Sequence, residues 1–176
     1  MHKRTIPIIH IIGLPGAGKT TLAKRLGKTL KVPVFCIGYY RARFPQTALG
    51  EADAWIALFL ELSQRGWKNC ILETTGLNSR EAFLRTALPF EQIFTIKLEA
   101  SRKTLNLRIR KKKKGDRGNR WLYSAKYRNK YEFARKFFKS FCRIPANCYI
   151  DTNRLTKAAV YLRAFKEINS VGLSEL

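Results

Sequence analysis

The chain reads Gly13-Leu14-Pro15-Gly16-Ala17-Gly18-Lys19-Thr20 near its start, and this stretch fits the pattern G-x-x-x-x-G-K-[ST] at every fixed position. The residues before it, 6–12, form a nearly continuous apolar run, as in a strand that is buried on both faces. Residues 19–30 follow it with leucines at four-residue intervals, which is the period of an amphipathic helix. The stretch therefore has the strand before it and the helix after it that a phosphate-binding turn requires.

Each fixed residue of this turn has a physical reason. Glycines let successive backbone N–H groups point inward at phosphate oxygens, and the helix that follows adds the positive end of its dipole. Lys19 would reach the β and γ phosphates, and the hydroxyl of Thr20 would bind Mg²⁺. We therefore predict a P-loop that binds ATP and Mg²⁺. Its predicted nucleotide-binding residues are Gly13, Gly16, Ala17, Gly18, Lys19, Thr20 and Thr21.

Along the rest of the chain, apolar runs of strand length alternate with segments of helical period, which is typical of a parallel sheet with crossover helices. The predicted strands are 6–12, 32–37, 70–72, 93–98 and 148–150. The predicted helices are 19–30, 51–65, 80–88 and 154–169, with a loop from Gly38 to Gly50 and a helix C-cap at Gly66. We expect an α/β protein with a three-layer P-loop NTPase fold and a parallel five-stranded sheet, in a single domain over residues 1–176.

The segment 101–141 is predicted to be a lid with a basic helical insertion. It holds sixteen Lys and Arg between residues 102 and 139 against Asp116 and Glu132, in a chain whose net charge is +23. This excess favours a polyanionic partner such as nucleic acid. Trp121 is a candidate for stacking on unpaired bases. The aromatic stripe 123–141 recurs at helical spacing and is better explained as core.

The remaining composition indicates a reduced, cytoplasmic setting. The four cysteines include no Cys-x-x-Cys pair, and three of them lie in or beside apolar runs, where thiols pack as small hydrophobic groups. No apolar run approaches the roughly 20 residues that cross a bilayer, so no membrane insertion is expected. Neither histidine has a partner at ligand spacing, and no structural metal is expected.

Four motifs together resemble the P-loop kinases of the nucleotide-kinase type, among them polynucleotide 5′-hydroxyl kinases and zeta-toxin-like kinases. The motifs are the stretch 13–23, Ile71-Leu72-Glu73-Thr74-Thr75-Gly76-Leu77-Asn78, Leu105-x-x-Arg108-x-Arg110, and Ile150-Asp151-Thr152. A GTPase is not indicated, because no Asn-Lys-x-Asp follows a late strand: the nearest string, at 129–132, ends in Glu. The resemblance implies transfer of the γ-phosphate of ATP to a hydroxyl group.

The resemblance also implies roles for single residues. Glu73, at the end of the third strand, would hold the Mg²⁺ water shell together with Thr20 or orient the acceptor. Arg108 would flank the nucleotide, and Arg117, on the turn 115–118, would close over the phosphates. The predicted catalytic residues are thus Lys19, Glu73, Arg108 and Arg117.

The acceptor side departs from these kinases. They carry Asp-x-x-Arg after the second strand, with the aspartate as base for the acceptor hydroxyl, whereas this chain has Gly38 at the aspartate position and keeps Arg41. Glu73, Glu51 and Asp53 are the carboxylates that could replace the missing base. Arg41 and Asp53 are the predicted acceptor-binding residues.

Three functions remain open on the sequence. The first is an ATP-dependent kinase whose acceptor is a nucleic-acid end, which combines the P-loop with the basic lid. The second is a small-molecule or nucleotide kinase with a merely basic surface. The third is a nucleic-acid-binding P-loop protein without transfer activity, which would explain Gly38 in place of the aspartate.

Overall fold

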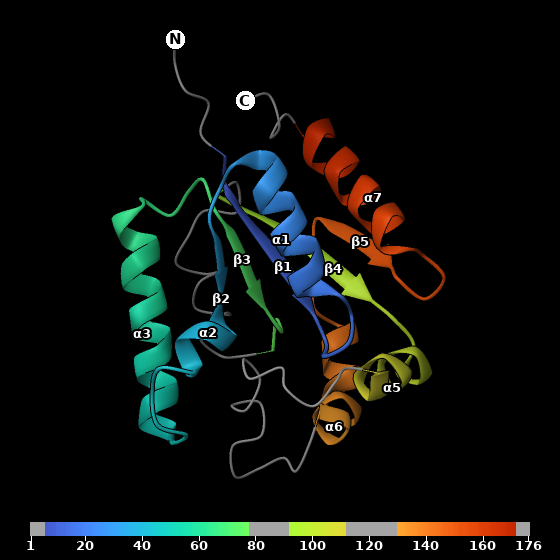
Figure 1. Cartoon of the computed structure of the whole chain (residues 1–176), viewed down its shortest axis with the longest axis horizontal. Helices are drawn as coiled ribbons and strands as arrows, with labels where there is room; N and C mark the ends of the chain where they lie inside the picture. The colour runs from blue at the N-terminus through green and yellow to red at the C-terminus, as the bar shows by residue number, and fades with distance from the viewer. Residues whose placement is uncertain (1–5, 78–91, 112–129, 172–176) are drawn as a thin grey trace.

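The computed structural model describes residues 6–77, 92–111 and 130–171 (Figure 1). A single sheet of five parallel strands runs in the order β2-β3-β1-β4-β5. The strands are β1 (Ile8–Gly13), β2 (Val34–Cys36), β3 (Ile71–Thr74), β4 (Ile93–Glu99) and β5 (Cys148–Asp151). The predicted parallel five-stranded sheet is therefore confirmed.

Helices cover the sheet on both faces, which gives the predicted three layers. The helices are α1 (Lys19–Leu30), α2 (Ile37–Arg41), α3 (Ala48–Gln64), α5 (Arg102–Lys111), α6 (Lys130–Cys142) and α7 (Lys157–Ser170). Figure 1 shows α1 and α7 side by side across one face of the sheet, with α3 beside the β2 edge. Helices α5 and α6 lie near the carboxyl ends of the strands, where α/β proteins bind ligands (Figure 1).

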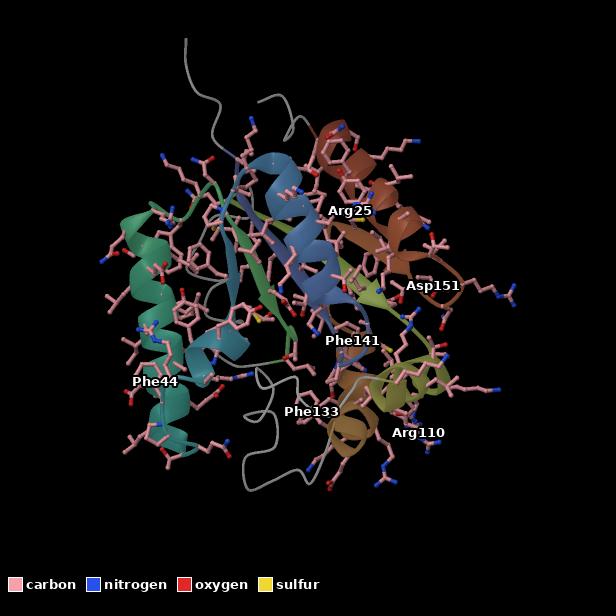
Figure 2. All side chains as sticks on the ribbon, in the orientation of Figure 1. Arg25, Phe44, Arg110, Phe133, Phe141 and Asp151 are labelled. Carbon is pink, nitrogen blue, oxygen red and sulfur yellow. The ribbon has the colours of Figure 1, made fainter. Side chains whose placement is uncertain are left out.

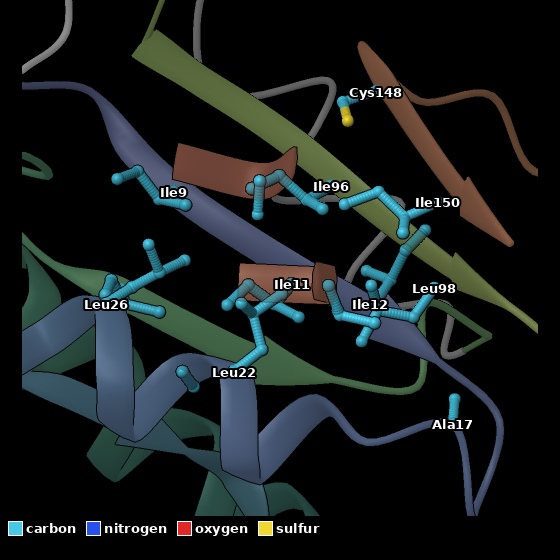
Figure 3. Close-up of a cluster of buried hydrophobic side chains, with 14 of the residues drawn as sticks. Ile9, Ile11, Ile12, Ala17, Leu22, Leu26, Ile96, Leu98, Cys148 and Ile150 are labelled. Carbon is cyan, nitrogen blue, oxygen red and sulfur yellow. The ribbon is translucent and has the colours of Figure 1, made fainter. Parts of the chain in front are cut away.

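The face under α1 and α7 holds the larger core. Ile9 and Ile11 of β1 point toward Leu22 and Leu26 of α1, and all four side chains are almost fully buried (Figure 3). Because side chains alternate across a strand, Ile8 points to the opposite face. There it joins a second core with residues of α3. Both faces of β1 are thus buried, which explains why its sequence is continuously apolar.

The second core is centred on α3. Trp55, Leu58 and Leu62 are at most 1% exposed and pack against Phe35 and Leu72 of the sheet. They recur at helical spacing on one side of α3, whereas Leu60 of the same helix is 60% exposed. Packing on one side fixes the orientation of α3 against the β2–β3 edge.

The difference in exposure between Leu58 and Leu60 predicts that replacing them has very different effects on stability. Leu58→Ala should lower the free energy of unfolding by about 2 to 5 kcal/mol, because it leaves a cavity at a fully buried position. Leu60→Ala makes the same chemical change at an exposed position and should stay within about 0.5 kcal/mol of the parent chain. Urea denaturation measures the free energy of unfolding of both variants. Equal losses would contradict the packing of α3 described above.

The second strand is shorter than predicted. β2 pairs with β3 only from Val34 to Cys36, and Ile37 begins the short helix α2 in place of the predicted strand end and loop. The buried side chain of Tyr40 and a backbone bond from the Ala42 N–H to the Gly38 carbonyl hold this turn. The prediction of a loop from Gly38 was wrong because contacts with distant residues stabilise this turn: Tyr40 packs in the core with residues of α3, and its hydroxyl donates a hydrogen bond to Glu61 of that helix.

Other strand and helix boundaries differ from the predicted ones by a few residues, for identifiable reasons. The first strand begins at Ile8 instead of residue 6, and Pro7, which has no N–H, forms only an isolated bridge. The hydroxyl of Thr47 caps α3 and that of Thr156 caps α7, so these helices begin at 48 and 157 instead of 51 and 154. Gly66, with φ of 63°, follows the end of α3 as predicted.

Part of the predicted lid is described as well. Helices α5 and α6 fall in the predicted segment 101–141, whereas the predicted helix 80–88, Arg117 and Trp121 lie outside the described residues. Over residues 6–77, 92–111 and 130–171, no helix combines the length and the apolar character that crossing a bilayer requires.

Candidate active site

The glycine-rich turn joins β1 to α1 in the conformation that the motif predicts. Gly16 and Gly18 have φ values of 88° and 101°, which residues with a side chain rarely adopt. Gly18 is the N-cap of α1 and provides no side-chain cap for the first turn of the helix. The N–H groups of this first turn have no partner within the helix, so they are suited to binding an anion.

Close packing adds a second requirement for glycine at position 16. A Cβ atom there would lie 2.9 Å from the carbonyl oxygen of Leu105 and 3.3 Å from Ile109, both on α5. At Gly13 a Cβ atom would lie 3.0 Å from that of Ala17. The turn is therefore pressed against α5, the first helix of the predicted lid.

We expect Gly16→Ala to weaken nucleotide binding by about tenfold or more, because it combines backbone strain of about 1 to 3 kcal/mol with displacement of α5. Gly66→Ala is the matched control. Position 66 also has a positive φ, but its Cβ atom would meet only the end of Lys68, at 3.5 Å. Calorimetry with ADP should therefore detect weaker binding for Gly16→Ala alone. Equal effects of the two variants would show that the contact with α5 is unimportant.

Lys19, Thr20 and Glu73 meet at the start of α1. The Thr20 hydroxyl donates a hydrogen bond of 2.8 Å to Oε1 of Glu73, across from the end of β3. Lys19 Nζ donates to the Leu14 carbonyl oxygen at 3.3 Å, within the turn. Glu73 is only 5% exposed, and its Oε2 accepts no hydrogen bond in the part of the chain that is described. The predicted lysine, hydroxyl and carboxylate thus form one cluster.

Cys36 also lies at this cluster, which the sequence analysis did not foresee. In the β2–β3 ladder it is the register partner of Glu73, so the two side chains point to the same face of the sheet. Burial, and secondarily the charge of Glu73, raises the pKa of the Cys36 thiol to about 12. In the sequence this cysteine lies in an apolar run. Its neighbour Glu73 is apparent only from the register between β2 and β3, which are far apart in the chain and adjacent in the sheet.

Arg108 of α5 is anchored to the end of the sheet. Its Nη1 donates a hydrogen bond of 2.8 Å to the hydroxyl of Thr152, and its Nη2 donates to the carbonyl oxygen of the same residue. The Thr152 hydroxyl in turn donates to the Glu99 carbonyl oxygen at 2.9 Å. This chain of bonds holds the half-buried guanidinium group at a fixed place between α5 and the loop that follows β5.

A cavity of about 460 Å³ extends from the glycine-rich turn to this loop. Its volume is in the range of pockets that hold small ligands. Polar groups of the turn, with Glu73, line one end, and Arg108 stands at its side. Ile109, Leu155 and Val160 add apolar side chains to the lining, and Thr152 and Lys157 add polar ones. The cavity therefore offers phosphate-binding groups at the turn together with apolar surface.

The predicted acceptor residues are not part of the cavity lining. Arg41 donates two hydrogen bonds to the Glu51 carboxylate, of 2.9 and 2.6 Å, and Trp55 Nε1 donates to the same carboxylate at 2.9 Å. Glu51 is therefore engaged in orienting Arg41. Asp53 is exposed on the side of α3 that also carries the exposed Leu60. Neither Arg41 nor Asp53 lines the cavity.

The described part of the basic lid combines a buried apolar side with a charged outer side. Ala134 and Phe141 of the predicted stripe are buried and Phe138 is half-buried against the same core, so these members of the stripe are core residues. Phe133, which the stripe did not include, is buried as well. Arg110 extends outward from α5, on its exposed side (Figure 2). Tyr123 and Tyr127 lie outside the described residues.

Comparison with known proteins was informative at the level of structure. No protein-family model matches the sequence, and no curated protein matches it. Shikimate kinase from Acinetobacter baumannii, solved with shikimate, superposes with a TM-score of 0.67 over 96% of each chain at 18% identity. Thymidylate kinase from Candida albicans gives 0.64 over 98% of this chain and 96% of its own at 17% identity. Gluconokinase from Sinorhizobium meliloti gives 0.63 over 96% and 95% at 13% identity.

The protein therefore has the fold of P-loop kinases over nearly its whole length. The superpositions establish this fold, whereas identities below 20% leave the substrate open. The finer resemblance to polynucleotide and zeta-toxin-like kinases gains no support from these structures, whose names refer to small acceptors.

Proposed function

We propose that the protein is an ATP- and Mg²⁺-dependent kinase that phosphorylates a hydroxyl group of a small molecule or nucleotide. The observation that carries this proposal is the cluster of Lys19, Thr20 and Glu73 at the phosphate end of the cavity. Phosphoryl transfer requires a helix start that binds anions, a positively charged side chain that reaches the terminal phosphate, and a carboxylate for the metal.

The cavity lining supplies the groups that a bound nucleotide would need. Backbone N–H groups at the start of α1 would hold the phosphates, and Lys19 would neutralise the charge that develops on the γ-phosphate. Arg108, fixed by Thr152, would flank the nucleotide, while Leu155 and Val160 supply apolar surface for the base. Because the transition state is loose, holding and neutralising these groups supplies most of the catalysis.

Two observations favour Mg²⁺ at the same place. The Thr20 hydroxyl and the Glu73 carboxylate are in hydrogen-bond contact, and Oε2 of Glu73 is a buried acceptor that lacks a donor among the described residues. Hydroxyl and carboxylate oxygens are the ligands that Mg²⁺ prefers. Thr20 and Glu73 would hold Mg²⁺ there, and the ion would supply positive charge that offsets the charge of the phosphates.

A small acceptor is the better supported of the two substrate classes. The structures with the same fold are named for shikimate, gluconate and thymidylate, and Arg41, one of the two predicted acceptor-binding residues, is paired with Glu51. A nucleic-acid end is the second candidate, because α5 and α6 expose a set of basic side chains. These are Arg102, Lys103, Arg110, Lys111, Arg135, Lys136 and Lys139.

An acceptor panel separates these functions. ADP release would be followed with ATP, Mg²⁺ and, in turn, polyhydroxy acids, sugars, nucleosides, nucleoside monophosphates and a 5′-hydroxyl oligonucleotide. We expect turnover with one of the small acceptors. Labelling of the oligonucleotide alone would favour the second candidate. Salt-sensitive oligonucleotide binding without any phosphorylated product would overturn both and favour a protein without transfer activity.

A further inference from the structure

We propose that Cys36 supplies a third protein ligand to the divalent cation, beside Thr20 and Glu73, so that this site favours thiophilic cations such as Cd²⁺ and Zn²⁺. The inference rests on the proposed function for the position of the nucleotide. It goes beyond that function because a site built from oxygen ligands alone would prefer Mg²⁺.

The sheet register brings the three residues together. Cys36 and Glu73 are partners at the carboxyl ends of β2 and β3, and neighbouring strands lie about 4.8 Å apart. Val34, two residues before Cys36 and on the same face, packs so closely on α1 that a Cβ atom at Gly27 would lie 2.4 Å from it. The face that carries Cys36 is therefore the one covered by α1, whose first turn holds Thr20.

The Glu73 carboxylate has one buried oxygen that could bind a cation. Oε1 accepts the hydrogen bond of the Thr20 hydroxyl, whereas Oε2 is buried and accepts no hydrogen bond from the described residues. Buried carboxylate oxygens in folded proteins are normally paired, and a bound ion is one of the explanations for an unpaired one. The neighbour on the β2 side is the thiol of Cys36, an electron-pair donor.

The chemistry of this ligand set differs from that of an oxygen-only site. A cation that binds Cys36 displaces the thiol proton to solvent and forms a metal–sulfur bond. Sulfur binds Cd²⁺ and Zn²⁺ far more strongly than it binds Mg²⁺. Glu73, the thiolate and the Thr20 hydroxyl provide three ligands, and nucleotide phosphate and water would complete the shell.

The other three cysteines provide internal controls. Cys70 and Cys148 are buried in the two hydrophobic cores, and Cys142 is exposed at the end of α6. Cys142→Ser removes the exposed thiol that would bind Cd²⁺ on its own. This variant is therefore the starting chain, and Cys148→Ser within it controls for the loss of any second thiol.

The experiment titrates Cd²⁺ into the Cys142→Ser chain with bound ADP and follows the ultraviolet sulfur-to-cadmium charge-transfer absorption. We expect a signal that saturates at one equivalent, persists when Cys148→Ser is added and disappears when Cys36→Ser is added. The ratio of Cd²⁺ to Mg²⁺ affinity, measured by competition, should fall about tenfold or more in the Cys36→Ser chain.

A signal that survives Cys36→Ser, or an unchanged affinity ratio, would overturn the proposal. Circular dichroism checks that the variants are folded. Should Cys36→Ser unfold, Glu73→Gln in the Cys142→Ser chain replaces it: Cd²⁺ affinity must then fall about tenfold or more, and an unchanged affinity again overturns the proposal. Phosphoryl transfer with Mg²⁺ is measured separately, so that failure of the thiol ligand and failure of the kinase function give different results.

Discussion

Lys19→Ala should lower kcat for ATP-dependent transfer by about a thousandfold or more. Lys19 lines the phosphate end of the cavity on the first turn of α1, beside Thr20. Its ammonium group would meet the charge that grows on the γ-phosphate oxygens in the transition state, and a preorganised positive charge at that position is worth at least two to three orders of magnitude in rate. Nucleotide binding should weaken less than catalysis, because the backbone N–H groups of the turn remain.

Lys24→Ala is the matched control for this variant. Lys24 is an exposed lysine of the same helix, so its replacement removes the same charge without touching the cavity. The measurement is single-turnover ADP formation with the acceptor found in the panel, together with calorimetry for ADP affinity. Should Lys19→Ala retain more than a tenth of the parent rate, transfer would not proceed at this turn, and the kinase proposal would be lost.

The sequence was sufficient for the parts of the fold that local pattern controls. The motif at 13–20 predicted the turn, because the glycine positions and the strand and helix beside it are encoded within some 25 residues. Helix α1 begins and ends where its leucine period predicts. Buried parallel strands give the continuous apolar runs from which all five strands were found. The short helix α2 was missed because distant contacts stabilise it.

The candidate site was less accessible to sequence reasoning, because it depends on which strands lie next to each other. Glu73 was found from its position at the end of a strand. Its neighbour Cys36 lies 37 positions earlier in the chain, and only the β2–β3 register brings the two together. The contact of Arg108 with Thr152 likewise joins α5 to the end of β5. No periodicity within one segment encodes such pairs.

Net charge alone does not identify the acceptor. A value of +23 favours polyanions at the protein surface, and it suggested a nucleic-acid end. In the structure the exposed basic side chains of α5 and α6 lie outside the set that lines the cavity, apart from Lys111. Surface charge governs encounter and solubility, whereas the acceptor is selected by the few groups beside the γ-phosphate. The two properties can therefore point to different ligands.

Glu73→Gln should lower kcat with Mg²⁺ by about a hundred- to a thousandfold while leaving binding of metal-free nucleotide nearly unchanged. The amide keeps an oxygen that can accept the Thr20 hydrogen bond, so the local structure should persist. What it loses is the negative charge that holds the cation, at a position where the parent carboxylate has a buried oxygen without a donor among the described residues.

Thermal unfolding distinguishes this loss of metal binding from a structural defect. ADP alone should raise the Tm of Glu73→Gln and of the parent chain equally, whereas the further rise on adding Mg²⁺ should be absent only in Glu73→Gln. Glu167→Gln on α7, outside the cavity lining, should retain both rises. An Mg²⁺-dependent rise that persists in Glu73→Gln would place the cation elsewhere, and Glu73 would then act on the acceptor. Because both roles use the same carboxylate, the metal dependence of the Tm is the quantity that separates them.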